Sequence, residues 1–277
     1  MMQLPFTKMH GLGNDFVVVQ GAGDLPAETI RRMADRHTGI GFDQLLWLQE
    51  AADGDADIFY RIFNADGGEA EQCGNGARCI ARFIAGPEDD FERIWKLAYP
   101  GGVVEARLQP DGDIAVAMGE PDFEPSSLPF DAAGLSTNGD LFQIEADGET
   151  FEIAVVSMGN PHAVIEIGGG VAPRIEELGP LLESHERFPK RANIGFMQIM
   201  SSEHIILRVF ERGAGETSAC GTGACAAVAV GRRAGKLSDD VIVQLPGGNL
   251  KVRWAGPGEP VWLIGEAVAA FEGVIEL

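Results

Sequence analysis

The chain has 277 residues, of which 45% are hydrophobic and 23% are charged, an ordinary globular composition with material for one large or two medium domains. A formal net charge of −21 argues against a nucleic-acid partner, because binding to a phosphate backbone needs a basic surface. The first residues lack the apolar core of a signal peptide and no apolar run approaches the roughly 20 residues of a membrane span, so we expect a soluble cytoplasmic protein without a membrane partner.

Local patterns predict a first set of elements in residues 6–120. Alternating apolar residues indicate strands on both sides of the loop 11–15, from residue 45 onward, and at 57–64, 93–98, 103–109 and 113–118. One helix is predicted at 27–35, with Asp24 as its cap and Pro26 near its first turn. A second helix is predicted at 74–85, where Gly86 and Pro87 stop it.

Residues 121–149 contain prolines and scattered Ser, Asp and Gly, and they predict a linker with one strand near 141–145. Residues 267–277, at the end of the chain, are expected to return to the first domain. Between these two segments, strands are predicted at 151–157, 163–167, 193–200, 204–210, 240–245, 250–254 and 261–265, and helices at 173–183 and 221–234.

The most informative pattern is an internal repeat, because a repeat decides the domain organisation. Arg61–Ala77 aligns without a gap on Arg208–Ala224, and eight of the seventeen positions are identical. With one single-residue gap the alignment extends to about residues 6–120 and 152–266, so the chain is predicted to contain two copies of one domain. The predicted domains are 1–120 with the returning 267–277, and 121–266.

Each copy has a cysteine, Cys73 or Cys220, followed by Gly-x-Gly-Ala at a predicted helix start. The partial positive charge of a helix N-terminus is expected to lower a thiol pKa from about 8.5 towards about 3.5–7.5, and uncovered N–H groups there can bind a carboxylate. Two such cysteines facing one carbon could remove a proton from one side and return one to the other, which inverts a stereocentre. The alternative is a purely architectural repeat with buried thiols, which is the expectation for Cys79 and Cys225 inside the helices.

Five segments follow one another along the chain: HGLGNDF (10–16), GIGFDQ (39–44), FNADGGEAEQCGNGARC (63–79), SMGNPHAV (157–164) and ERGAGETSACGTGAC (211–225). In this order they resemble the diaminopimelate epimerase family, and the resemblance runs from Lys8 to about Cys225 and weakly to the end. It implies an α/β (α+β) fold of two pseudo-symmetric domains, each a mostly antiparallel curved sheet around a central helix, with the active site in the cleft between them. It also implies an epimerase independent of pyridoxal phosphate that interconverts LL- and meso-diaminopimelate in lysine and peptidoglycan-precursor biosynthesis.

The same resemblance implies that Cys73 and Cys220 are the two catalytic bases and that His162 and Glu211 adjust the ionisation of the thiols. Arg212 would bind the distal carboxylate of the substrate, since a guanidinium can do so in a bidentate manner, and Glu211 would accept the distal ammonium. The residues implied to bind substrate are Asn14, Gln44, Asn64, Gly74, Asn75, Asn160, Asn193, Glu211, Arg212, Gly221 and Thr222.

No cofactor is expected, because the sequence has neither a P-loop nor a G-x-G-x-x-G after a strand. No metal is expected either, since the four histidines other than His162 are scattered along the sequence. The partner is predicted to be a small-molecule substrate. Three alternatives remain open: a proline or hydroxyproline racemase, a non-catalytic amino-acid-binding protein, and a thiol redox protein. Asn75 and the Glu211–Arg212 pair favour a substrate with a polar second end. A homodimer is compatible with the sequence, which leaves the oligomeric state open.

Overall fold

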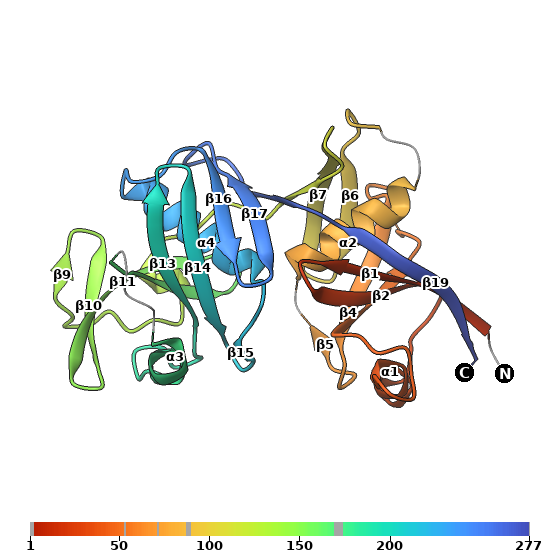
Figure 1. Cartoon of the computed structure of the whole chain (residues 1–277), viewed down its shortest axis with the longest axis horizontal. Coiled ribbons are helices and arrows are strands. Elements are labelled where there is room, and N and C mark those ends of the chain that lie inside the picture. The colour runs from red at the N-terminus through yellow and green to blue at the C-terminus, as the bar shows by residue number, and fades with distance from the viewer. Residues whose placement is uncertain (1–2, 53, 71, 87–89, 169–173, 277) are drawn as a thin grey trace. The chain divides into compact units, whose positions relative to one another are not determined.

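The computed structural model describes residues 3–52, 54–70, 72–86, 90–168 and 174–276. The chain divides into two compact units: unit 1 is Met1–Ala117 with Ile264–Leu277, and unit 2 is Met118–Leu263. Within these described ranges, each unit combines a mixed sheet with two α-helices (Figure 1). The mixed α+β class and the duplicated two-domain plan predicted from the sequence are confirmed. Among the described residues, no helix combines the length and the apolar character needed to cross a membrane.

In unit 1 the strands are ordered β19–β1–β2–β3–β4–β6–β7–β8, with β2–β3 and β4–β6 parallel and the other pairs antiparallel. The short strand β5 also pairs with β4. The elements are β1 (Gln3–Gly11), β2 (Asn14–Gln20), α1 (Ala27–Ala34), β3 (Gln44–Gln49), β4 (Ile58–Asn64), β5 (Glu69–Ala70), α2 (Gly74–Ala85), β6 (Trp95–Tyr99), β7 (Gly102–Leu108), β8 (Ile114–Ala117) and β19 (Val268–Glu276).

Unit 2 repeats this order as β10–β11–β12–β13–β14–β16–β17. As in unit 1, the third and fifth pairings are parallel, here β12–β13 and β14–β16. β10 pairs with β11 as β19 pairs with β1. The elements are η1 (Pro125–Ser127), β9 (Thr137–Asn138), β10 (Leu141–Ala146), β11 (Glu149–Ser157), β12 (Pro161–Glu166), α3 (Ile175–Glu183), β13 (Asn193–Ser201), β14 (His204–Glu211), β15 (Gly215–Glu216), α4 (Gly221–Arg233), β16 (Asp240–Leu245) and β17 (Gly248–Arg253). The chain then passes from unit 2 back to unit 1 within β18 (Trp262–Gly265).

Burial explains why these segments form the elements that they do. Phe16–Val19 in β2 and Leu45–Leu48 in β3 are continuous apolar runs that are buried throughout, as expected for parallel strands covered on both faces. The helices α2 and α4 are buried around most of their circumference, with nine of twelve and ten of thirteen residues buried. Small residues make this possible in α4, where Ala224–Ala229 contains no side chain larger than valine.

Two sequence predictions are wrong. Asp24 does not cap α1, whose N-cap residue is Pro26 with no side-chain cap; the Asp24 carboxylate instead forms an ion pair with Arg61, because a nearby guanidinium is the stronger partner. Residues 121–149 are not a linker, since their apolar side chains belong to the core of unit 2. The predicted helix start at Pro173 lies outside the described residues, and α3 is described from Ile175.

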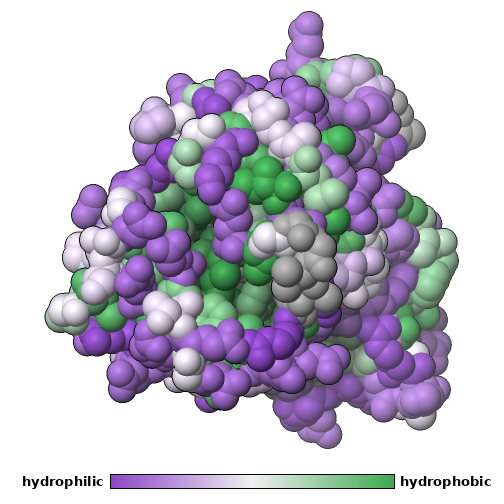
Figure 2. Space-filling view, turned by 60° about the vertical axis from the view of Figure 1, so that its left-hand side comes forward, coloured by the Kyte–Doolittle hydropathy of each residue, from purple (hydrophilic) through white to green (hydrophobic). Residues whose placement is uncertain are grey.

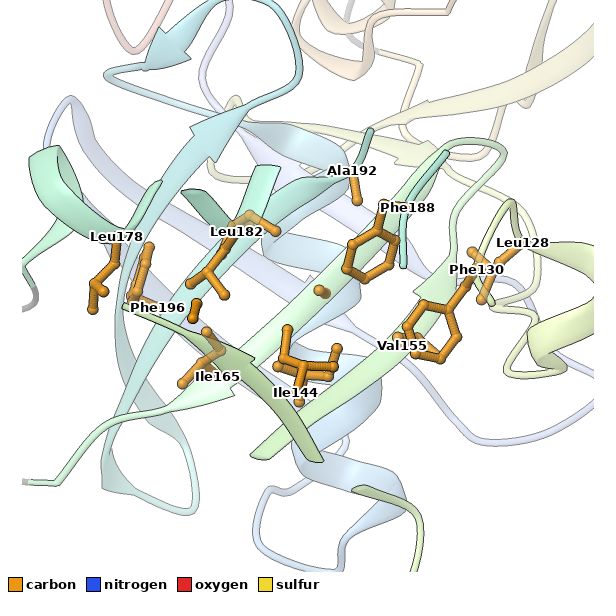
Figure 3. Packing of buried hydrophobic residues seen from close by; sticks show 14 of the residues in the cluster. Leu128, Phe130, Ile144, Val155, Ile165, Leu178, Leu182, Phe188, Ala192 and Phe196 are labelled. Carbon is orange, nitrogen blue, oxygen red and sulfur yellow. The ribbon is translucent and has the colours of Figure 1, made fainter. Parts of the chain in front are cut away.

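Figure 3 shows the core to which this segment contributes. Phe130, from the segment predicted as a linker, lies against Phe188 with ring centroids 4.9 Å apart and meets Phe142 edge-on at 5.1 Å. Ile144 from β10 and Leu182 from α3 belong to the same cluster. The segment that joins the two copies is therefore an integral part of unit 2.

Unit 2 also contains a cavity of about 610 Å³ lined by residues of β11, β12 and β13, the last turn of α4 and the β9–β10 region. Figure 2 shows an apolar hollow ringed by hydrophilic atoms on one face of the molecule. The ion pairs Arg233–Asp140 and Lys236–Glu166 are formed by residues that line the cavity. None of the site residues predicted from the sequence is among the described residues that line it.

Candidate active site

Both repeated cysteines occupy the N-cap position of the central helix of their unit. Cys73 precedes α2 with φ −125° and ψ 113°, and Cys220 precedes α4 with φ −109° and ψ 105°. Neither cysteine forms a standard side-chain cap, although the Gly223 N–H in the first turn of α4 is a hydrogen-bond partner of the Cys220 sulfur. The two copies therefore share one backbone geometry at the residue predicted to react.

The second glycine of the repeated motif is explained by a close approach of helix and strand. A Cβ on Gly223 would lie 2.9 Å from Val209 Cγ2 and 3.2 Å from Cys220 Sγ. A Cβ on Gly76 would lie 3.0 Å from Leu46 Cδ2. A side chain at either position would push the helix start away from the sheet.

In unit 1 the structure brings three predicted residues together at the start of α2. Asn14 Oδ1 lies 3.9 Å from Cys73 Sγ and accepts a hydrogen bond from Asn75 Nδ2 at 3.2 Å. Gln44 and Asn64 form a separate pair across β3 and β4, in which Gln44 Nε2 donates to Asn64 Oδ1 at 2.9 Å. Gly74 is the first residue of α2 and is buried.

A charged cluster that the sequence analysis did not single out lies beside Asn14. Arg36 bridges the Asp15 and Asp43 carboxylates, Lys8 forms an ion pair with Asp15, and Asn14 Nδ2 donates to Asp43 Oδ2 at 3.1 Å. Burial by itself raises the pKa of Asp15, but hydrogen bonds from Arg36 and Lys8 outweigh burial and hold this pKa well below its usual range. Asp43 lies within the GIGFDQ segment, and this motif was the signal in the sequence that could have identified it as a site residue.

In unit 2 the environment of Cys220 contradicts the expectation of a lowered thiol pKa. Cys220 is 4% exposed, and burial followed by the charge of Glu211 raises the pKa of its thiol well above the ordinary value. The Gly223 N–H and the Thr222 hydroxyl, which lies 3.7 Å from Sγ, act in the opposite direction but are weaker. Desolvation therefore outweighs the helix N-terminus at this cysteine.

His162 and Asn160 complete the surroundings of Thr222. Asn160 Nδ2 donates to Thr222 Oγ1 at 3.3 Å, and Asn160 Oδ1 lies 2.9 Å from His162 Nε2. Burial, followed by the charge of Arg212, lowers the pKa of His162 to about 3, so the imidazole is neutral at pH 7. A carbonyl oxygen can only accept, and hence Nε2 carries the proton of the neutral ring.

The remaining predicted residues of unit 2 are held by internal hydrogen bonds. Asn193 is 3% exposed; its Nδ2 donates to the Pro161 carbonyl at 3.1 Å, and its Oδ1 accepts from the Arg212 N–H at 2.9 Å. Asn193 therefore ties β12 to the residue after β14. The Thr217 hydroxyl donates to the Glu211 carboxylate, a contact that the sequence analysis missed although Thr217 lies within a quoted segment.

The buried imidazole leads to a prediction about pH and stability. Because the pKa of His162 falls from about 6.5 in an unfolded chain to about 3 in the folded protein, the unfolded state binds the extra proton below pH 6.5. We expect this group to cost roughly 2 kcal/mol of unfolding free energy between pH 7 and pH 5. Urea denaturation at both pH values should show a smaller loss for His162→Gln than for the wild type. Equal losses in the two proteins would contradict the prediction.

The described residues contain no group of three or more His, Cys, Asp or Glu side chains arranged to hold a metal ion. The polar groups at both helix starts, N–H groups, amides and a hydroxyl, are instead of the kind that binds an amino acid through its carboxylate and ammonium. The cysteine at the start of each helix provides a group that can accept or donate a proton.

Solved structures with this fold include proteins described by several different activities. A hydroxyproline epimerase from Agrobacterium vitis aligns with a TM-score of 0.70 and 16% identity over 99% of this chain and 92% of that one. A phenazine biosynthesis protein of the PhzF family from Bacillus anthracis aligns with a TM-score of 0.67 and 18% identity over the full length of both chains. At such identities these likenesses show the fold alone.

Sequence comparisons identify the family. Residues 6–124 and 154–270 match the profile of the family described as diaminopimelate epimerase. A protein from Stutzerimonas stutzeri (strain A1501) described as diaminopimelate epimerase is 48% identical over 279 aligned positions, which cover 100% of both chains. The resemblance found in the sequence is confirmed, and the chain belongs to the diaminopimelate epimerase family of isomerases.

Proposed function

We propose that the chain interconverts LL- and meso-diaminopimelate with Cys73 and Cys220 as the two proton-transfer groups. The observation that carries this proposal is a cysteine at the N-cap of the central helix in both units. One sulfur, as thiolate, takes the proton from Cα, and the other, as thiol, returns a proton to the opposite face. Protons balance over a turnover, after which the protonation states of the two sulfurs have exchanged.

The helix starts supply the binding energy for the reacting end of the substrate. The N–H groups at Gly74-Asn75 and Gly221-Thr222 would hold its carboxylate and stabilise the negative charge that develops when Cα loses its proton. At the distal end, Arg212 would bind the carboxylate and Glu211 the ammonium. The remaining polar residues predicted to contact the substrate are Asn14, Gln44, Asn64, Asn160 and Asn193.

Substrate binding would also change the pKa of the Cys220 thiol. Glu211 is one of the two main causes that hold this thiol protonated. A substrate ammonium paired with Glu211 would offset the charge of that carboxylate and so lower the pKa of the Cys220 thiol once the site is filled. This fall would favour the thiolate when a substrate is present to react with it.

The test is incubation with LL-diaminopimelate in deuterated water. The proposal predicts deuterium at Cα and the appearance of the meso isomer without any added cofactor. A folded protein that produces neither would refute it. Proline and trans-4-hydroxy-L-proline belong in the same assay and should not be turned over, because they lack the second amino-acid group that Glu211 and Arg212 are proposed to bind.

We also propose that units 1 and 2 correspond to the two epimerase domains, with bounds near 1–120 plus 267–277 and 121–266, and that the enzyme works in the cytoplasm on a small-molecule substrate. A carbon placed between two half-sites requires one cysteine from each domain. The repeat, in which each unit has its own N-cap cysteine, supports this arrangement.

A homodimer formed through β19 is the oligomer that we propose. β19 is exposed over most of its nine residues and presents Val268, Phe271 and Val274 with exposed fractions of 38%, 52% and 59%. Exposed apolar strands of this length are sites for association with another chain. We expect Phe271→Glu/Val274→Glu to shift a wild-type dimer towards monomer in sedimentation equilibrium. Ile242→Glu, a similarly exposed apolar position on β16, is the control and should leave the dimer intact. A monomeric wild type at micromolar concentration would contradict the proposal.

A further inference from the structure

The two repeated asparagines lie in opposite orientations beside their helix starts. In unit 1, Asn14 turns its oxygen towards Cys73 Sγ and Asn75 Nδ2. In unit 2, Asn160 turns its amide nitrogen towards Thr222 Oγ1. The first half-site therefore presents an acceptor to the start of α2, and the second presents a donor to the start of α4.

A different residue fixes the orientation in each copy. The Asp43 carboxylate accepts from Asn14 Nδ2, whereas His162 Nε2 donates to Asn160 Oδ1. Strand register shows which positions correspond, because Phe16 pairs with Gln44 in β2–β3 and His162 pairs with Asn193 in β12–β13.

By this correspondence, Phe16 stands in unit 1 where His162 stands in unit 2. The residue before Gln44 is Asp43, and the residue before Asn193 is Ala192. Unit 1 therefore has Asp43 to orient its asparagine, where unit 2 has Ala192. Unit 2 has His162 to orient its asparagine, where unit 1 has Phe16. Neither alanine nor phenylalanine has a side-chain atom that forms hydrogen bonds, so the two asparagines are oriented from different positions and in opposite directions.

The contacts of Asp43 leave Asn14 one favourable orientation. Asp43 Oδ1 pairs with Arg36 at 2.7 Å, while Oδ2 accepts from both the Asp15 N–H and Asn14 Nδ2 at 3.1 Å. A flipped Asn14 would place its oxygen against this carboxylate and its amide nitrogen against Asn75 Nδ2. Both contacts would then be repulsive.

We propose that Asp43 is a positioning residue that holds the Asn14 oxygen towards Cys73 and Asn75; this proposal rests on the proposed function. The half-site of unit 1 then presents a hydrogen-bond acceptor to its sulfur, whereas the half-site of unit 2 presents a donor. An acceptor beside a sulfur favours the thiol, because a thiol can donate to it and a thiolate cannot. In unit 2, Asn160 donates to the Thr222 oxygen and thereby leaves the Thr222 hydroxyl proton free to point at Cys220.

Two ionisable groups that interact with Cys73 in the described part of the chain do not supply this bias around neutral pH. Tyr60 and Cys79 both interact electrostatically with Cys73, but burial raises the pKa of Tyr60 far above neutrality and that of Cys79 to about 12. The charged residues Asp15, Lys8 and Arg36 are all retained in the Asp43 variants described below. Changes in Cys73 reactivity on altering Asp43 would therefore report on Asn14.

The experiment measures alkylation of Cys73 by iodoacetamide against pH, with site-resolved mass spectrometry and no substrate. Asp43→Ala removes the acceptor, so Asn14 can turn its amide nitrogen to the sulfur and stabilise the thiolate. We expect the alkylation midpoint to fall by about one pH unit and kcat/KM for diaminopimelate to fall about tenfold. Asp43→Asn, which can keep an oxygen towards Asn14, should retain a midpoint near that of the wild type.

Arg36→Ala is the matched control, because it breaks the same Arg36–Asp43 ion pair but leaves Asp43 Oδ2 in contact with Asn14. An unchanged midpoint in folded Asp43→Ala would overturn the proposal, and so would an equal shift in Arg36→Ala. If Asp43→Ala does not fold, as judged by circular dichroism, Asp43→Leu carries the same expectation, because its side chain is similar in size and also lacks an acceptor. Alkylation does not require turnover, and hence the result stands whether or not the proposed reaction is found.

Discussion

Cys73→Ala and Cys220→Ala are each expected to lower kcat for epimerisation by about 10²–10⁴-fold, the range that one positioned acid or base contributes. Inversion needs both groups, because one sulfur removes the proton and the other returns one to the opposite face. The double variant should lose little beyond either single variant, since residues that act as a unit are not additive. Conversion of LL- to meso-diaminopimelate, followed by chiral chromatography, gives the rates.

The chain offers matched controls for this experiment. Cys79 and Cys225 lie in the same two helices and are fully buried. Cys79→Ala and Cys225→Ala remove the same atoms without touching either N-cap, and we expect their kcat to stay within a few-fold of the wild type. Wild-type turnover in Cys73→Ala or in Cys220→Ala would contradict the two-thiol mechanism.

Phe188→Ala is expected to lower the free energy of unfolding of unit 2 by about 3–5 kcal/mol. Phe188 is 3% exposed and lies between α3 and β13 with its ring against Phe130, so truncation leaves a void in a core that includes residues of the 121–149 segment (Figure 3). Urea denaturation followed by circular dichroism provides the measurement.

An exposed phenylalanine provides the comparison. Phe91 is 44% exposed, and Phe91→Ala should change the free energy of unfolding by no more than about 0.5 kcal/mol. A loss at Phe188 as small as that at Phe91 would mean that the segment 121–149 is not part of the core of unit 2.

Much of the fold could be predicted because local signals and the repeat agree. The helix predicted at 74–85 has those bounds as α2, since its sequence has a glycine-rich start and a Gly-Pro stop. The strand predicted at 240–245 is likewise β16. The two-residue strands β5, β9 and β15 were missed because so few residues carry no periodicity.

The failure at 121–149 has a different cause. Prolines and polar residues there indicate a loop, while Leu128, Phe130, Ile144 and Ala146 are spaced too irregularly to signal a buried face. Their burial follows from packing against α3 and the sheet of unit 2, which no local pattern records.

For the candidate site, the repeat located Cys73 and Cys220 at the two N-caps from sequence alone. It could not give the pKa of the Cys220 thiol, because burial outweighs the helix N-terminus there. Asp43 was also missed as an orienting residue, since its contact with Asn14 depends on the parallel register of β2 and β3, which are far apart in sequence. The proposed contacts of the other site residues with substrate remain predictions.

The proposed inversion requires two sulfurs to reach one carbon. A crystal structure with an unreactive diaminopimelate analogue bound tests this directly, through the distances from Cys73 Sγ and Cys220 Sγ to the reacting Cα. Both sulfurs are expected to lie about 3–3.5 Å from that carbon, on opposite faces. A bound analogue whose Cα is approached by one sulfur only, or with the second sulfur directed into the interior of its own unit, would contradict it.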